Sequence, residues 1–399
     1  MPPLRILFAI ETLIPPRGGA ERFWLELLEA LAERHEATAV FLGDRRPDAR
    51  KPGGVRLIPV DPPPDAGGYW ATKRARREAV AAAVRAALAD EGADVVATAL
   101  HAGPGAVAAA AEAGIPAVVF LHSYEALCKY AHNAGSHCVP ESGCRACPSA
   151  AALPAEERAE LFASRREHTH ALASATTLVA PSAAVASRCE AWSGRRPVLV
   201  PDVVRDTPPA RADHDGPVVL AAASWAFNKG RDLLEPFAAI FERRVLRITA
   251  AGLGPELERR LSARPGVRIV PNAPVEELLD GAAALLVPSQ WPEPFGRLAF
   301  EGLAARVPTL ASATGGLLEY VPPAQLVDPP DSPVRWRDAL EALLEPGEWE
   351  AARQRGRSAA QAVLATDPVR RAEDVLIGAA ASGGAAPRRY GAAPVETSR

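Results

Sequence analysis

The chain has 399 residues, of which 48% are hydrophobic and 23% charged, and its formal net charge is −3. This length accommodates two ordinary domains, each with its own core, and the composition is that of a globular protein. The small negative charge gives no reason to expect a nucleic-acid partner. No run of 18 apolar residues occurs, so the sequence predicts no membrane span.

Two features bear on the cellular compartment. The apolar stretch at residues 4–10 has the character of a first β-strand, so we expect no signal peptide there. The five cysteines are an odd number, which fits reduced thiols better than a disulfide framework. We therefore expect a cytoplasmic protein.

Apolar strands alternate with helical segments along the chain, which is typical of parallel α/β sheets. In the first half, strands are predicted at 4–10, 37–42, 55–60, 94–99, 117–121 and 177–180, and helices at 20–34, 70–90 and 183–192. Residues 193–216, rich in proline and charge, are predicted to connect two domains. In the second half, strands are predicted at 217–222, 245–251, 267–270, 282–287 and 309–311, and helices at 275–280, 297–305, 337–344, 349–364 and 369–379.

The segment PSQWPEPFGRLAFEG, residues 288–302, follows a predicted buried strand. The helix predicted after its Pro-Phe-Gly turn is apolar on nearly every face and should be buried. Glu301 within it then needs a polar partner, since an unpaired buried carboxylate is costly. The backbone N–H groups of Phe295, Gly296 and Arg297 would be free at the helix start, where phosphate oxygens bind readily. The segment suits a ligand with hydroxyls and a diphosphate; alternatively, Arg297 and Glu301 form an ordinary i,i+4 ion pair and Glu293 is a solvated loop acid.

This segment resembles the E-x7-E signature of the retaining glycosyltransferases of family 4, which have the GT-B fold of two Rossmann-like domains facing across a cleft. The similarity continues to the stretch SATGGLLEYV at residues 312–321. The resemblance implies that Glu301 holds the ribose hydroxyls of a nucleotide sugar and that Glu293 contacts the transferred sugar. The backbone at Phe295 and Gly296 would meet the sugar and the diphosphate.

The resemblance also implies the domain organisation. Residues 1–200 would form an N-terminal Rossmann-like acceptor domain with a cysteine-rich loop at 122–150, and residues 206–365 the donor domain. A helix at 366–381 would cross back to the first domain, and the Gly, Ala, Pro and Arg composition of 382–399 predicts a disordered tail. The stretch VPDVV, residues 200–204, resembles the Pro-Asn-Gly turn between the family's domains, with Asp202 in place of asparagine.

Further donor-site residues are predicted on both domains. Gly18 and Gly19 lie at a helix start, where glycine lets the backbone approach an anionic ligand, although a Gly-Gly turn is also a common connector. By resemblance, Lys229 in NKGR would bind the diphosphate, for which lysine is a suitable point charge. The family commonly has an arginine five residues earlier, where this chain has Ser224, so Arg231 or Arg297 would have to supply the second cation.

His122 is predicted just beyond the carboxyl end of a strand, where ligands of α/β proteins bind. A lone histidine is often structural, but the family has a histidine contacting the donor sugar at a similar place. We therefore expect His122 to orient the sugar by hydrogen bonding and not to act as a general base.

Cysteines cluster within twenty residues, at Cys128, Cys138, Cys144 and Cys147. The last two have the C-x2-C spacing that lets two thiolates reach one metal ion. The four cysteines could form a structural zinc site that stabilises a long loop with few apolar side chains. The alternatives are an iron–sulfur cluster and four reduced thiols. Cys189 is best explained as a small buried apolar residue.

The family resemblance implies a retaining hexosyltransferase that uses a nucleotide diphosphate sugar and needs no catalytic metal. The acceptor would be a glycan, a lipid-linked molecule or a small natural product. Retention would arise from attack on the same face as the departing phosphate, without the two-carboxylate scheme of many glycoside hydrolases. Two alternatives keep the fold: a nucleotide-sugar-binding protein without turnover, and a phosphorylase or an enzyme that accepts a sugar phosphate.

Overall fold

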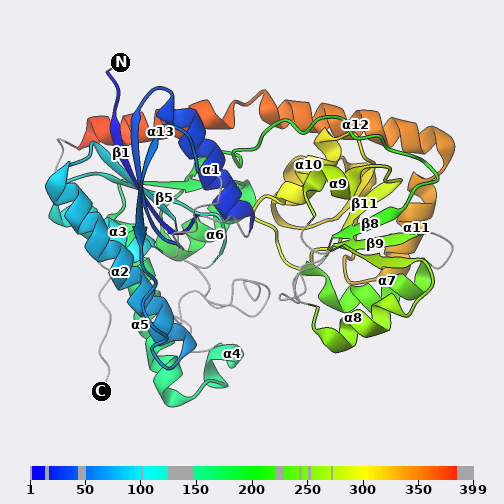
Figure 1. Ribbon diagram of the computed structural model, residues 1–399, viewed down its shortest axis with the longest axis horizontal. Helices are drawn as coiled ribbons and strands as arrows, with labels where there is room; N and C mark the ends of the chain where they lie inside the picture. The colour runs from blue at the N-terminus through cyan, green and yellow to red at the C-terminus, as the bar shows by residue number, and fades with distance from the viewer. Residues whose placement is uncertain are drawn as a thin grey trace.

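The computed structural model describes residues 2–13, 18–43, 51–99, 102–124, 147–221, 229–241, 245–249, 253–270 and 273–383. These residues form two α/β domains, each a parallel sheet with helices packed on both faces (Figure 1). The predicted fold class is therefore confirmed. Within the described part of the chain, no helix is both long enough and apolar enough to cross a bilayer.

The first domain has seven parallel strands in the order β3-β2-β1-β4-β5-β6-β7. They are β1 (Arg5–Thr12), β2 (Glu36–Leu42), β3 (Val55–Val60), β4 (Val95–Ala99), β5 (Ala117–Phe120), β6 (Thr177–Ala180) and β7 (Val198–Leu199). The helices are α1 (Gly19–Ala32), α2 (Tyr69–Asp90), α3 (Gly103–Glu112), α4 (Pro148–Ala151), α5 (Ala155–Ser174) and α6 (Ala183–Ser193).

The second domain has six parallel strands in the order β10-β9-β8-β11-β12-β13. They are β8 (Val218–Ala221), β9 (Leu246–Thr249), β10 (Val267–Ile269), β11 (Ala284–Val287), β12 (Thr309–Ser312) and β13 (Leu326–Val327). The helices are α7 (Leu234–Ile240), α8 (Pro255–Ser262), α9 (Val275–Leu279), α10 (Arg297–Ala304), α11 (Pro333–Leu343) and α12 (Pro346–Leu364). Short 3₁₀ segments are η4 (Arg231–Leu233), η5 (Gly315–Glu319) and η6 (Pro323–Gln325).

The predicted connection at 193–216 was wrong at its start, because β7 lies inside it and pairs with β6. This strand has only two residues, both exposed, so its apolar signal is too short to recognise among prolines and charges. The remainder is not a free linker either. Val200 and Val203 pack in the core of the first domain, and Val204 packs in that of the second.

In both sheets the strand order reverses between two neighbouring strands, β1 and β4 in the first domain and β8 and β11 in the second. Ligands of open α/β sheets bind beyond the carboxyl ends of the strands at such a point. The segments after β1, β8 and β11 lead to Gly18, Lys229 and Glu293, respectively. The topology thus places three predicted site regions at the ligand-binding edges of the two sheets.

Each sheet is covered on both faces by buried apolar side chains. In the first domain, α2, α3, α5 and α6 pack on one face and α1 and α13 on the other. In the second domain, α7, α8 and α11 pack on one face and α9 and α10 on the other, while α12 contributes to both. This two-sided burial explains why the strands are nearly continuous runs of valine, leucine, isoleucine and alanine.

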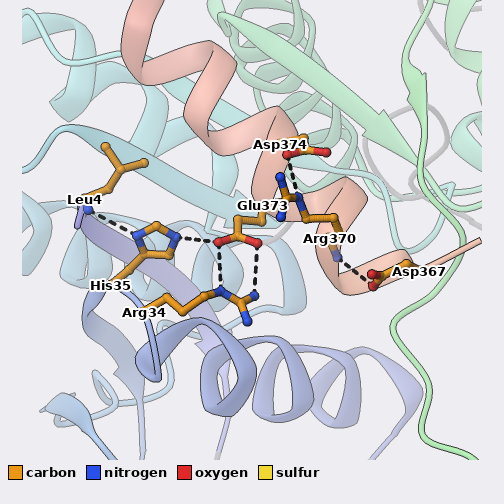
Figure 2. Close-up of polar contacts among 7 residues, drawn as sticks. All are labelled: Leu4, Arg34, His35, Asp367, Arg370, Glu373 and Asp374. Atoms are coloured by element: carbon orange, nitrogen blue, oxygen red, sulfur yellow. Dashed lines mark hydrogen bonds and ion pairs between the residues drawn. The ribbon is translucent and has the colours of Figure 1, made fainter. Parts of the chain in front are cut away.

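The last helix, α13 (Pro368–Ser382), returns to the first domain (Figure 1). Figure 2 shows its main polar anchor, the buried carboxylate of Glu373. Arg34 donates two hydrogen bonds of 3.0 Å to this carboxylate. His35 Nδ1 accepts the Leu4 N–H at 3.1 Å, so Nε2 carries the ring proton and donates to Glu373 at 2.9 Å. Burial acts to raise the pKa of Glu373, but the bonds from Arg34 and His35 lower it overall.

We predict that Glu373→Ala loosens α13 from the first domain. The change leaves a buried histidine N–H without its acceptor, which costs about 1–3 kcal/mol. Because the folded-state pKa of Glu373 is lowered, its contribution is present at neutral pH and disappears as the pH falls through that folded value. Thermal unfolding at neutral pH should therefore show a clear loss of stability that shrinks in acid. The neighbouring Asp374→Ala is the control, since Asp374 is exposed and pairs only along the helix with Arg370; equal losses in both variants would contradict the prediction.

Candidate functional site

The carboxylate of Glu293 lies in the loop that follows β11 and is only 4% exposed. Lys229 Nζ, which comes from the segment after β8, lies 2.5 Å from Glu293 Oε1. The hydroxyl of Ser289 also donates to that oxygen. The cation and the hydroxyl donor hold this buried carboxylate in place. Glu293 is therefore not the solvated loop acid of the alternative reading.

Glycines allow the neighbouring backbone to approach this loop closely. Gly230 has φ +81°, and a Cβ there would lie 2.5 Å from the carbonyl oxygen of Pro288. Gly315 has φ +58°, and a Cβ there would lie 2.4 Å from the carbonyl oxygen of Glu293. Gly316 donates its N–H to the same oxygen at 2.7 Å. The Lys-Gly and Gly-Gly pairs thus hold the Glu293 loop from two sides.

We predict that Gly230→Ala displaces Lys229 from Glu293 and reduces both stability and turnover. A β-carbon at positive φ costs about 1–2 kcal/mol by itself, and here it also overlaps the backbone at Pro288. Gly67→Ala is a matched control, because Gly67 has the same φ of +81° but nothing within 4 Å of the added carbon. Unfolding temperature and kcat should both fall further in Gly230→Ala, and identical behaviour of the two variants would refute the steric argument.

The start of α10 offers open backbone donors. Gly296 caps the helix in the left-handed region with φ +93°, and its carbonyl accepts a 2.7 Å hydrogen bond from the Tyr320 hydroxyl. Among the described residues, no hydrogen bond uses the N–H groups of Phe295, Gly296 or Arg297. The ring of Phe295 stacks on Tyr320 at 4.9 Å and is buried. At this helix start the backbone N–H of Phe295 is therefore open, whereas its ring is packed away.

Glu301 lies one turn further along α10 and is 8% exposed. Burial raises the pKa of its carboxyl group, with Arg22 and Arg297 acting in the opposite direction. Its polar partner is Arg22 of the first domain, whose Nη1 lies 3.3 Å from Glu301 Oε1. The sequence predicted that such a partner must exist but did not identify it.

The guanidinium of Arg297 points to the first domain and the connection, not along α10 to Glu301. It forms two 2.9 Å bonds to the Glu26 carboxylate and donates to the Val203 carbonyl at 2.5 Å. It also lies 3.6 Å from Asp202. Burial raises the pKa of Asp202 to about 7, although Arg297 acts to lower it. Among the described contacts, Arg297 therefore forms no i,i+4 ion pair with Glu301.

Gly18 and Gly19 begin α1, as predicted, with Gly18 in extended conformation at the N-cap position. A Cβ on Gly19 would lie 3.0 Å from Cδ of Arg297. The start of α1 is therefore packed against the start of α10 across the two domains. The contact brings Gly19, Arg22 and the open N–H groups of α10 into one region.

His122 follows β5, and its ring packs on Phe23 at 4.2 Å and on Trp24 at 5.3 Å. Burial, together with a smaller effect of the Arg297 cation, lowers the pKa of His122 to about 3, so the imidazole is neutral. Its Nε2 is buried and has no hydrogen-bond partner among the described residues. A neutral ring with an unused nitrogen fits the predicted orienting role better than acid–base chemistry.

Trp291 was not predicted from the sequence, although it lies between the two domains. It packs with the first domain's core and meets Tyr124 edge-on at 5.8 Å. Lys229 Nζ lies 4.9 Å from its ring centroid. This aromatic side chain therefore connects the Glu293 loop of the second domain to the segment that follows β5.

Some predicted residues are not tested by the described contacts. Arg231 begins η4 and is partly exposed, and Ser224 lies outside the described residues. Three of the clustered cysteines, Cys128, Cys138 and Cys144, also lie outside them. Cys147 is a free, partly buried thiol beside Trp70, and the described residues contain no group of three or more potential metal ligands. Cys189 is a fully buried free thiol, as expected.

Taken together, the second domain presents a buried carboxylate, a lysine and an open helix start, with a second buried carboxylate one turn along. Carboxylates accept hydroxyl groups, whereas the lysine and the N–H groups attract phosphate oxygens. The site can therefore bind a polyhydroxylated molecule that carries a phosphate group.

Comparison with known proteins agrees with this geometry. Residues 18–201 match the family model described as "Glycosyl transferase 4-like domain", and residues 205–362 match "Glycosyl transferases group 1". A curated D-inositol 3-phosphate glycosyltransferase of Frankia alni is 34% identical over 173 residues, which are 38% of this chain and 41% of that protein. One from Corynebacterium diphtheriae is 40% identical over 96 residues, 23% of this chain and 22% of that protein. The chain thus matches less than half the length of these curated relatives.

Solved structures resemble the whole fold. Sucrose-phosphate synthase of Thermosynechococcus elongatus has a TM-score of 0.71 at 19% identity, covering 95% of this chain and 100% of that one. Anabaena HepE in complex with UDP-glucose has a TM-score of 0.66 at 15% identity, covering 94% and 100%. At these identities the solved structures show a shared fold alone, whereas the two family matches show similarity of sequence. On both grounds, the chain belongs to the group 1 glycosyltransferases of GT-B fold, with a glycosyl transferase 4-like domain followed by a group 1 domain.

Proposed function

We propose that the protein is a retaining hexosyltransferase that moves a hexose from a nucleotide diphosphate sugar to a hydroxyl of an acceptor. The observation that carries the proposal is the buried Glu293, which is held by Lys229 and Ser289 directly ahead of the open start of α10. In this arrangement Glu293 meets the sugar and Glu301 the ribose. Lys229 and the backbone at Phe295, Gly296 and Arg297 meet the diphosphate.

These residues act mainly by stabilising the charge of the leaving diphosphate. As the glycosidic bond breaks, negative charge grows on the diphosphate, and fixed donors aimed at it lower the barrier. In the proposed scheme the acceptor attacks from the same face that the phosphate leaves, which retains the anomeric configuration. In this scheme Glu293 and the neutral His122 hold the sugar, and neither transfers a proton.

A binding screen tests the donor site. Purified protein should be examined by thermal shift and calorimetry against UDP, GDP, ADP, TDP and their common hexose derivatives. We expect selective micromolar binding to one base. Folded protein that binds none of these ligands would contradict the proposal. The anomeric configuration of the product, measured by NMR once an acceptor is found, tests retention separately.

The first domain would hold the acceptor, which we propose to be a glycan, a lipid-linked molecule or a small natural product. The names of the two curated relatives make a phosphorylated polyol a sensible first acceptor to assay. We propose no catalytic metal, because Lys229 and the helix start supply positive charge; activity should then survive EDTA. A structural zinc at Cys128, Cys138, Cys144 and Cys147 is a separate proposal, tested by metal analysis of the purified protein.

We also propose that the protein works in the cytoplasm, in keeping with the free thiols of Cys147 and Cys189. A second candidate function is a nucleotide-sugar-binding protein without turnover. It is favoured by Ser224, which stands where the family commonly has a cation. Tight donor binding together with neither hydrolysis nor transfer to any acceptor would support this second candidate.

A further inference from the structure

The proposed donor site has one cation fewer than its family. Ser224 replaces the arginine that commonly accompanies the phosphate-binding lysine, so another group must share the charge of the diphosphate. Arg297 is near the helix start, but its guanidinium is buried against Glu26 and Val203. Moving it to a phosphate would leave the Glu26 carboxylate without its partner, which is costly. Its side chain is therefore a poor substitute.

Arg22 is better placed to be that cation. It lies in the first turn of α1, next to Gly18 and Gly19, and reaches across to the second domain. Its Nη1 is 3.3 Å from Glu301 Oε1, yet its side chain is 47% exposed while that of Glu301 is 10% exposed. The ion pair thus joins a half-exposed cation to a largely buried carboxylate. Such a partly exposed pair is weak, because water competes for the guanidinium.

The partner of Arg22 is the carboxylate proposed to bind the donor's ribose. When two ribose hydroxyls donate to Glu301, they take up acceptor positions that the guanidinium uses in the donor-free protein. The 5′ oxygen of the same ribose carries the diphosphate, so the phosphoryl groups lie next to the sugar. A guanidinium displaced from the Glu301 carboxylate would therefore be near those phosphoryl groups.

We propose that Arg22 is a donor-binding residue that leaves Glu301 when the ribose arrives and then pairs with the diphosphate. This inference rests on the proposed function of the site. The planar guanidinium donates two parallel hydrogen bonds to phosphate, which suits a charged leaving group. Because α1 belongs to the first domain, the donor would be bound completely only when both domains contact it.

The proposal predicts different effects of one substitution on two ligands that differ only in phosphate. In Arg22→Ala, a nucleoside should bind as well as in the wild type or a few-fold more tightly, since nothing competes for Glu301. The corresponding nucleoside diphosphate should bind about 10-fold more weakly, because a charged hydrogen bond to phosphate is lost. Arg22→Lys should recover part of the diphosphate affinity and leave the nucleoside affinity unchanged.

The experiment is calorimetry with uridine and UDP, or with the guanosine, adenosine or thymidine pair if the donor screen selects that base. Arg85→Ala serves as the control, because Arg85 pairs with Glu112 on the surface of the first domain. If both ligands bind more tightly to Arg22→Ala by the same factor, Arg22 only competes for Glu301 and does not bind phosphate. If both affinities are unchanged, Arg22 neither competes for Glu301 nor binds phosphate. Either result overturns the inference. If wild type and Arg22→Ala bind UDP with the same affinity, only the role of Arg22 is refuted. If the wild type binds no nucleotide, the proposed function itself is refuted.

Discussion

Replacing Lys229 with alanine is expected to lower kcat for glycosyl transfer by about 10²–10³-fold, the usual effect of removing one group that stabilises transition-state charge. The lysine comes from the segment after β8 and lies 2.5 Å from Glu293, at the open start of α10. Its charge should matter most as the diphosphate departs. The donor's binding constant should therefore change less than kcat.

This result needs a control for folding, because Lys229 is also the cation beside a buried carboxylate. Lys229→Arg retains the charge and should recover part of the activity. Lys51→Ala removes an exposed lysine of the first domain and should have no effect. Steady-state kinetics should be compared with unfolding temperature for all three variants. A Lys229→Ala enzyme that is folded and nearly as active as the wild type would remove Lys229 from the mechanism.

Glu301→Ala is expected to weaken nucleotide binding by about 100-fold, since each of two hydroxyl hydrogen bonds to a carboxylate contributes roughly 1.5 kcal/mol net of water. The fold should tolerate the change, because the partner left behind, Arg22, is about half exposed and can be solvated. Calorimetry of the selected nucleoside diphosphate measures the loss directly.

A change of ligand isolates the ribose contact from any general disturbance of the site. A 2′,3′-dideoxy nucleoside diphosphate lacks the hydroxyls that Glu301 is proposed to hold. It should bind wild type and Glu301→Ala with similar affinity. If the variant weakens the dideoxy and the natural ligand by the same factor, Glu301 does not bind the ribose, and the decrease reflects a distorted α10.

The relation between Glu293 and Glu301 was predictable because the two residues are close together in the chain, whereas Lys229 is 64 residues from Glu293. Glu293 and Glu301 are separated by one turn and part of a short helix, so their relation follows from local structure. The glycines at 230, 315 and 316 are recognisable in the sequence. The need for glycine at these positions is seen only in the structure, where the carbonyl oxygens of Pro288 and Glu293 approach them closely. Whether these residues bind a donor remains a prediction.

Contacts between the domains were not predictable in the same way. Arg22 and Glu301 are 279 residues apart, and Arg297 and Glu26 are 271 apart. A single sequence carries no periodic signal for such pairs; it indicated only that a buried Glu301 requires some partner. The same applies to Trp291, whose packing on the first domain depends on the docking of two separately formed units.

Elements were predicted well where the apolar pattern is long and poorly where it is short or diluted. Strands β1 to β6 were found within about two residues, in keeping with the uncertainty expected at element ends. Helix α3 was missed because it is built largely of alanine and glycine, and α5 because charged residues occupy much of its length. The two-residue β7 is too short to give a signal.

The chain passes between the domains at two places. The first crossing lies between Val203, in the core of the first domain, and Val204, in the core of the second. The second lies between α12 and α13, at Asp367 with φ +50°. Two bodies tied at two points cannot separate or slide freely, and their easiest relative motion is rotation about the line through both ties. Rotation about that line is therefore the domain motion we expect. Arg297 lies at the first crossing, where it bonds the Val203 carbonyl, and Arg22 contacts Glu301 across the two domains.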